Sequence, residues 1–126
     1  MLIIYPAVIH NGNGEYWAEF PDLVGCQTYG ETLEETIIGA KEALEAYAIS
    51  LLERGIKLPV ASSAKTIEVD ENSFVSLVDT DISAYLNSAK AVKKTLTIPQ
   101  WLNDAAVKKG INFSQMLQDA LLKSIY

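Results

Sequence analysis

The sequence has one cysteine, one histidine and no long apolar run, and each scarcity excludes a class of protein. The lone Cys26 cannot form an intrachain disulfide or build a zinc site by itself. No apolar stretch approaches the roughly 20 residues needed to cross a bilayer, and residues 1–9 lack the basic start and the cleavage site of a secretory signal. We therefore expect a cytoplasmic protein with no membrane partner and no structural metal.

Charge is distributed unevenly along the 126 residues, which carry a net charge of −6. Residues 1–92 hold fourteen acidic and five basic side chains, a net −9, whereas residues 93–126 hold five lysines and two aspartates, a net +3. An acidic surface attracts a basic protein and a basic surface attracts phosphate, so the split favours two partners of opposite sign. Splits of this kind also arise by chance.

Residues 1–86 are expected to form an α+β domain, with an antiparallel-rich sheet and one long packed helix. Two largely apolar stretches, residues 1–10 and 14–20, flank the sequence Asn11-Gly12-Asn13-Gly14. Its two Asn-Gly pairs supply the positive φ angles of a tight turn, so the stretches predict a β-hairpin. The other expected elements are a strand over 25–29, a loop over 59–64, strands over 66–69 and 74–79, and a short helical turn over 82–86.

The long helix is predicted by its caps and its period. Thr32 and Glu35 form a Thr-x-x-Glu capping box, in which the hydroxyl and the carboxylate each satisfy a backbone N–H at the helix start. Gly55 offers the left-handed stop at the other end. The apolar stripe with a 3.6-residue period consists of Ile37, Ala40, Leu44, Tyr47, Ala48, Leu51 and Leu52.

The tail is predicted to be a second domain, residues 93–126, after a linker over 87–92. An alternating strand over 93–99 precedes two short helices separated by Gly110, and a module of this size cannot bury a core alone. A lone strand with two unpaired edges is unstable, so two chains must pair their strands, which makes the protein a homodimer. The predicted dimer core is Leu96, Ile98, Trp101, Leu102, Leu117 and Leu121.

Pairing of the two strands would create a DNA-binding face. Lys93, Thr95 and Thr97 would then lie together on a two-stranded ribbon, which fits the major groove. The start of the last helix would present free backbone N–H groups to a phosphate. Alternatively, the tail is a helical hairpin used only for dimerisation. The helix-start positions are Asn112, Phe113 and Ser114.

Several short motifs of the first domain occur together. They are Tyr5-Pro-Ala-Val-Ile9, Tyr16-Trp-Ala-Glu-Phe-Pro-Asp-Leu-Val-Gly-Cys26, Gly30-Glu-Thr-Leu-Glu-Glu35 and Leu58-Pro59. With them the whole chain resembles the HicB antitoxins of type II toxin–antitoxin systems, although Val24 stands where that family more often has proline.

The resemblance implies a partial RNase H-like fold for residues 1–86 and a ribbon-helix-helix for residues 93–126. It also implies a partner, a small basic HicA toxin that cleaves mRNA using a histidine. The antitoxin would cover this toxin and, with or without it, repress their shared operon by binding operator DNA as a dimer. With the toxin it would form a heterotetramer or a larger complex. Because that toxin is basic and binds RNA, the acidic first domain would be the part that faces it.

An RNase H-like fold raises the hypothesis of a metal-dependent nuclease, with Glu19, Asp22 and Asp79 as ligands. Their spacing does not indicate a metal cage. No nucleophile can be assigned to His10, which we expect to be a solvated strand end, and no base to Cys26, which we expect to be a packing residue. We therefore predict no catalytic residues, no cofactor and no enzyme activity.

Trp17, Asp22 and Tyr29 are the candidates for toxin contacts. Trp17 is either an exposed anchor or a residue buried under the long helix, and the alternation of its strand allows both. Two other functions stay open: a stand-alone ribbon-helix-helix repressor whose first domain senses a ligand, and an enzyme with a DNA-binding tail.

Overall fold

The computed structural model describes residues 1–88 and 90–125, and the chain divides into two compact units, Met1–Ala89 and Lys90–Tyr126. Ala89 of the predicted linker and Tyr126 at the end of the predicted second domain lie outside the described residues. None of the helices in the described ranges is long and apolar enough to cross a bilayer.

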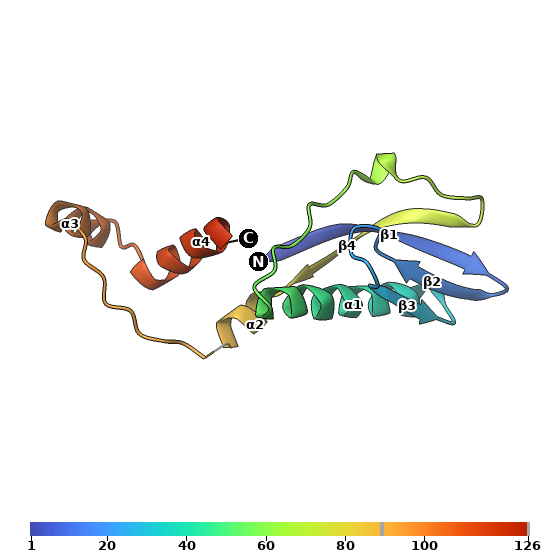
Figure 1. Ribbon diagram of the computed structural model, residues 1–126, viewed down its shortest axis with the longest axis horizontal. Coiled ribbons are helices and arrows are strands. Elements are labelled where there is room, and N and C mark those ends of the chain that lie inside the picture. Colours follow the sequence, from blue (N-terminus) through green and yellow to red (C-terminus); the bar gives the residue numbers. More distant parts are fainter. Residues whose placement is uncertain (89, 126) are drawn as a thin grey trace. The chain divides into compact units, whose positions relative to one another are not determined.

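The first unit is a four-stranded antiparallel sheet with one long helix along one of its faces (Figure 1). The strand order is β3-β2-β1-β4, and every neighbouring pair runs antiparallel. This α+β architecture confirms the expected sheet and packed helix. The elements are β1 Leu2–Gly12, β2 Glu15–Glu19, β3 Gln27–Gly30, α1 Leu33–Glu53, a 3₁₀ turn Ala64–Thr66, β4 Ser73–Asp81 and α2 Ser83–Ser88.

The β1–β2 turn is the predicted hairpin. Gly12 pairs with Glu15, so the loop consists of two residues, Asn13 and Gly14. Their φ angles of 52° and 81° are both left-handed, which is the conformation that a type I′ turn requires. The register of the two strands follows from this turn.

Both predicted caps of α1 are present. The Thr32 hydroxyl accepts a hydrogen bond from the Glu35 N–H at 3.1 Å, and the Glu35 carboxylate accepts one from the Glu31 N–H at 3.1 Å. At the other end Gly55 has a φ of 68°, and the Ile56 N–H donates to the Leu51 carbonyl at 2.9 Å.

The core lies between α1 and the sheet. Ile9 of β1 and Leu44 of α1 are fully buried there, and burial of each such side chain stabilises the fold by roughly 1.5–3 kcal/mol. Successive strand residues point to opposite faces, so the buried Pro6 and Val8 face away from α1. The segment between α1 and β4 runs on that other side of the sheet (Figure 1).

The predicted strand over 66–69 is wrong. The chain forms a 3₁₀ turn over Ala64–Thr66, in which the N–H and the hydroxyl of Thr66 both donate to the Ser63 carbonyl, at 3.0 and 2.8 Å, and residues 67–69 have no regular secondary structure. This local bonding takes Thr66 out of the predicted strand. Ile67 is still extended, but residues 67–69 pair with none of the four strands of the sheet. Helix α2 continues to Ser88, so it includes the first two residues of the segment predicted as a linker.

The second unit contains α3 Gln100–Lys108 and α4 Phe113–Ile125. Both predicted helices are present, and Gly110, with a φ of 71°, separates them. Residues 90–99 have no regular secondary structure, and no residue in the range 90–125 is buried. The predicted strand over 93–99 needs a second chain to pair with, so it stays a prediction.

Candidate functional site

A row of rings crosses the sheet on the face opposite α1. His10 of β1 pairs with Trp17 of β2, which pairs with Tyr29 of β3. The His10 and Trp17 rings are stacked with centroids 3.9 Å apart, and the Trp17 and Tyr29 rings with centroids 6.3 Å apart. We call these three residues the aromatic row.

The position of Trp17 decides between its two predicted environments. Its neighbour Ala18 is fully buried in the core, so strand alternation points Trp17 away from α1. Trp17 is partly exposed, and Tyr29 is 72% exposed. Two of the three predicted toxin contacts therefore lie side by side on an open surface.

His10 is not the solvated strand end that we expected. Its Nδ1 lies 2.8 Å from the Ser73 hydroxyl, its Nε2 lies 3.3 Å from a Glu19 carboxylate oxygen, and one face of its ring is covered by Trp17. Strand β4 brings Ser73 opposite His10, a pairing across 63 residues that no local pattern indicates. The imidazole therefore holds the Trp17 ring in place.

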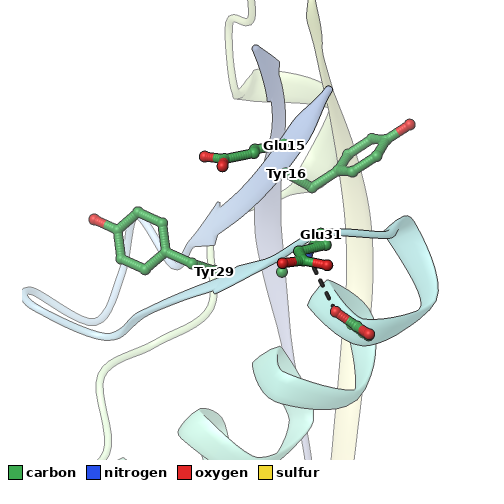
Figure 2. Close-up of a pocket in the computed structure, with 6 residues that line it drawn as sticks. Glu15, Tyr16, Tyr29 and Glu31 are labelled. Atoms are coloured by element: carbon green, nitrogen blue, oxygen red, sulfur yellow. Dashed lines mark hydrogen bonds between the residues drawn. The ribbon is translucent and has the colours of Figure 1, made fainter. Parts of the chain in front are cut away.

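An open hollow of about 530 Å³ adjoins the row at Tyr29 (Figure 2). Glu15 and Tyr29 extend to the same side of their strands, whereas Tyr16 points away from them (Figure 2). We call this the acidic hollow. Its lining residues are Glu15, Tyr16, Tyr29, Gly30, Glu31 and Glu35.

The acidic hollow combines carboxylates with aromatic walls and no counter-charge. Among the described residues, no lysine or arginine forms an ion pair with Glu15, Glu31 or Glu35. The described ranges also contain no group of three side chains placed to hold a metal ion. No pattern in the sequence indicates this hollow, because its lining residues come from three separate elements, β2, β3 and the start of α1. The capping box at Glu35 was the one local signal nearby.

Asp22, the third predicted toxin contact, has other partners. Its carboxylate accepts hydrogen bonds from the backbone N–H of Ser62, at 2.9 Å, and from the Ser62 hydroxyl. Asp22 thereby ties the β2–β3 loop to the segment after α1. Burial, followed by the charge of Asp22, raises the pKa of Tyr5, whose hydroxyl donates to the Pro59 carbonyl.

Two of the three carboxylates considered as metal ligands have structural partners, whereas Asp79 is exposed on β4. Glu19 contacts His10, and Asp22 is bonded to Ser62. Cys26 is buried in the core, as expected of a packing residue, and burial raises the pKa of its thiol to about 11. At neutral pH the thiol therefore stays protonated and is a poor nucleophile.

The predicted functional residues of the tail remain on its surface. Lys93, Thr95 and Thr97 lie in the segment without regular structure, and Phe113 and Ser114 are exposed at the start of α4. The Asn112 side chain accepts a hydrogen bond from the Gln115 N–H at 3.1 Å and so caps that helix. The predicted dimer core is exposed or half-exposed in the single chain: Leu96, Ile98, Trp101, Leu102, Leu117 and Leu121.

The chain matches one protein family along most of its length. A family model described as HicB_like antitoxin of bacterial toxin-antitoxin system matches residues 5–120. An uncharacterized 14.9 kDa protein of Haemophilus phage HP1 is 31% identical over 103 residues, which are 79% of this chain and 76% of the phage protein.

Solved structures give the same result. A chain of a toxin–antitoxin complex from Streptococcus pneumoniae is 32% identical, with a TM-score of 0.64 over 98% of this chain and 99% of that one. The antitoxin HicB3 is 29% identical, with a TM-score of 0.59 over 98% of both chains. The fold is that of HicB antitoxins, with a mixed sheet-and-helix unit followed by a helical unit. The chain belongs to the HicB-like antitoxins of bacterial toxin–antitoxin systems.

Proposed function

We propose that this antitoxin binds and neutralises a small basic HicA-type toxin, and that it represses the operon of the pair by binding operator DNA as a dimer in the cytoplasm. The observation that carries the first part is the match along 98% of this chain to a chain of a toxin–antitoxin complex. The role is binding rather than catalysis.

The charge and the open surface of the first unit support a basic partner. Residues 1–92 have a net charge of −9, and complementary charge speeds encounter and excludes wrong partners. Exposed aromatic side chains are frequent anchors in interfaces, and the aromatic row presents two of them. We propose Trp17 and Tyr29 as toxin contacts. We also propose Asp22, in the loop between β2 and β3, as a third contact.

The exposed apolar residues of the second unit support dimerisation. Trp101 is 71% exposed and Leu96 is 63% exposed. Burial of large apolar side chains stabilises a fold, so their exposure in the single chain favours a second chain that covers them. Two chains that pair residues 93–99 as a ribbon would bury these side chains and align Lys93, Thr95 and Thr97 for DNA. We accordingly propose a ribbon-helix-helix over residues 93–126, after a partial RNase H-like unit over 1–86.

Co-expression tests both parts. The chain is produced together with the short basic protein that this proposal predicts beside its gene, and the purified material is titrated against operator DNA at several salt concentrations. We expect co-purification, an even number of antitoxin chains, and operator affinity that falls steeply with salt. Operator binding without any neighbouring basic protein would instead favour the ligand-sensing repressor.

Deletion of residues 90–126 separates the two activities. The first unit has its own buried core, so it should stay folded, monomeric and able to bind toxin, but it should not shift operator DNA. A truncated protein that is dimeric and still binds the operator contradicts the proposed tail.

A further inference from the structure

We propose that the acidic hollow is the socket for an arginine side chain of the basic toxin, with Tyr29 as the ring on which the guanidinium stacks. This inference rests on the proposed function, because it names the group of the toxin that the first unit recognises. It concerns Glu15 and Glu31, neither of which was a predicted contact.

Unbalanced charge is the first argument for a cationic occupant. Three carboxylates, those of Glu15, Glu31 and Glu35, line one hollow, and no lysine or arginine in the described part of the chain pairs with them. A guanidinium that binds here forms hydrogen bonds with the carboxylates that are strengthened by the opposite charges.

The dimensions of the hollow select among cations. Its carboxylates do not converge as metal ligands do, since the described residues hold no group of three metal-binding side chains. A volume of about 530 Å³ is far larger than a bare ion needs. A planar guanidinium with five donors can reach carboxylates that lie apart, whereas a compact ammonium cannot, so arginine fits better than lysine.

The aromatic wall provides a second attraction. Tyr29 is 72% exposed, so its ring has a surface free for contact, while Trp17 supports it from the next strand. Guanidinium groups stack on such rings through cation–π attraction, and the nearby carboxylates bind the same group. Tyr29 belongs to both the row and the hollow, which makes the two features one interaction surface.

Part of the surface is held in place in the free chain. Glu35 is held by the Glu31 N–H, and Trp17 is held by the His10 ring, which is itself fixed by Glu19 and Ser73. A site whose walls are ordered in advance loses less conformational entropy when its ligand binds. A single arginine anchor can therefore contribute measurably to the affinity.

The test uses isosteric charge removal in the full-length antitoxin, with the co-expressed basic neighbour as the ligand. The variant Glu15→Gln/Glu31→Gln should bind the toxin about tenfold more weakly than the wild type in calorimetric titration. The control Glu42→Gln/Glu45→Gln removes the same charge from exposed positions on α1 and should bind within about twofold of the wild type. Equal weakening by both pairs would show only a general charge effect and would overturn the socket.

Two further measurements identify the occupant. Tyr29→Phe should keep the affinity and Tyr29→Ala should lose it, because stacking needs the ring and not the hydroxyl. In double-mutant cycles, Glu31→Gln should couple to one toxin arginine. Coupling to a lysine, or to no basic residue, overturns the arginine assignment. If the wild-type antitoxin itself fails to bind the toxin, the proposed function fails with it, so the two failures are distinguishable.

Discussion

The indole of Trp17 lies on the imidazole of His10, with centroids 3.9 Å apart and planes within 14° of parallel. The imidazole cannot move freely, because Ser73 and Glu19 contact its two nitrogens at 2.8 and 3.3 Å. Trp17 therefore presents a rigid, partly exposed surface on the sheet face opposite α1. Large side chains held in this way are the ones that concentrate binding energy.

Replacement of Trp17 by alanine should weaken toxin binding without unfolding the antitoxin. Loss of an aromatic hot spot costs about 2 kcal/mol or more, which is roughly a 30-fold rise in Kd. Calorimetric titration with the toxin measures the effect, and circular dichroism checks the fold. Ile38→Ala is the control, since Ile38 is 61% exposed on α1, away from this face. Unchanged affinity in the Trp17 variant would remove this residue from the interface.

Gly30 should tolerate no side chain, because β3 and the first turn of α1 approach each other at this position. A Cβ on Gly30 would lie 2.5 Å from the Thr36 hydroxyl oxygen and 2.8 Å from the Thr36 backbone nitrogen. We expect Gly30→Ala to lower the free energy of unfolding by about 1–3 kcal/mol in urea denaturation. At Gly12 a Cβ meets nothing within 4 Å, so Gly12→Ala should change the free energy of unfolding by less than about 1 kcal/mol.

The sequence was sufficient to predict elements whose causes are local. The Asn13-Gly14 turn and the Thr32–Glu35 capping box each need only a few neighbouring residues, and both are present. The two-residue turn even fixes which residues face each other across β1 and β2, including His10 and Trp17.

Features that depend on distant contacts could not be predicted in this way. The pairing of Ser73 with His10 spans 63 residues, and it turned an expected solvated histidine into a supporting group. The strand expected over 66–69 is absent, because Thr66 bonds locally to Ser63 and residues 67–69 pair with none of the four strands of the sheet. The acidic hollow needs β2, β3 and α1 in place together, and no spacing along the chain brings Glu15 to Glu31.

Lys93 should contribute to DNA binding through phosphate rather than through base recognition. Lys93→Ala is expected to weaken operator and random DNA alike and to reduce the salt slope of binding by about one. Thr95→Ala and Thr97→Ala should instead reduce the preference for the operator, since hydroxyls read base edges. Fluorescence anisotropy at several salt concentrations separates these outcomes, with Lys65→Ala of the first unit as the control. A salt slope equal to that of the wild type in the Lys93 variant argues against a phosphate contact.

Asp81 should make the stability of the first unit depend on acid pH. The hydroxyl and the backbone N–H of Ser83, together with the Met1 ammonium, donate to its carboxylate and lower its pKa to about 2. An unfolded aspartate titrates near ~3.9, so this stabilisation is complete above that pH and is lost as the pH falls towards 2.

Asp81→Asn should therefore have a lower Tm than the wild type at pH 7, and the difference should shrink as the pH falls to 2. Ser83→Ala removes the donor that contributes most to the low pKa, so it should produce the same trend from the other side of the hydrogen bond. Differential scanning calorimetry at pH 7, 4 and 2 measures all three proteins. Ser83 also begins α2, so a loss of helix alone would lower the Tm equally at every pH. The effect belongs to the ionised carboxylate only if both variants have a Tm below that of the wild type by an amount that shrinks as the pH falls.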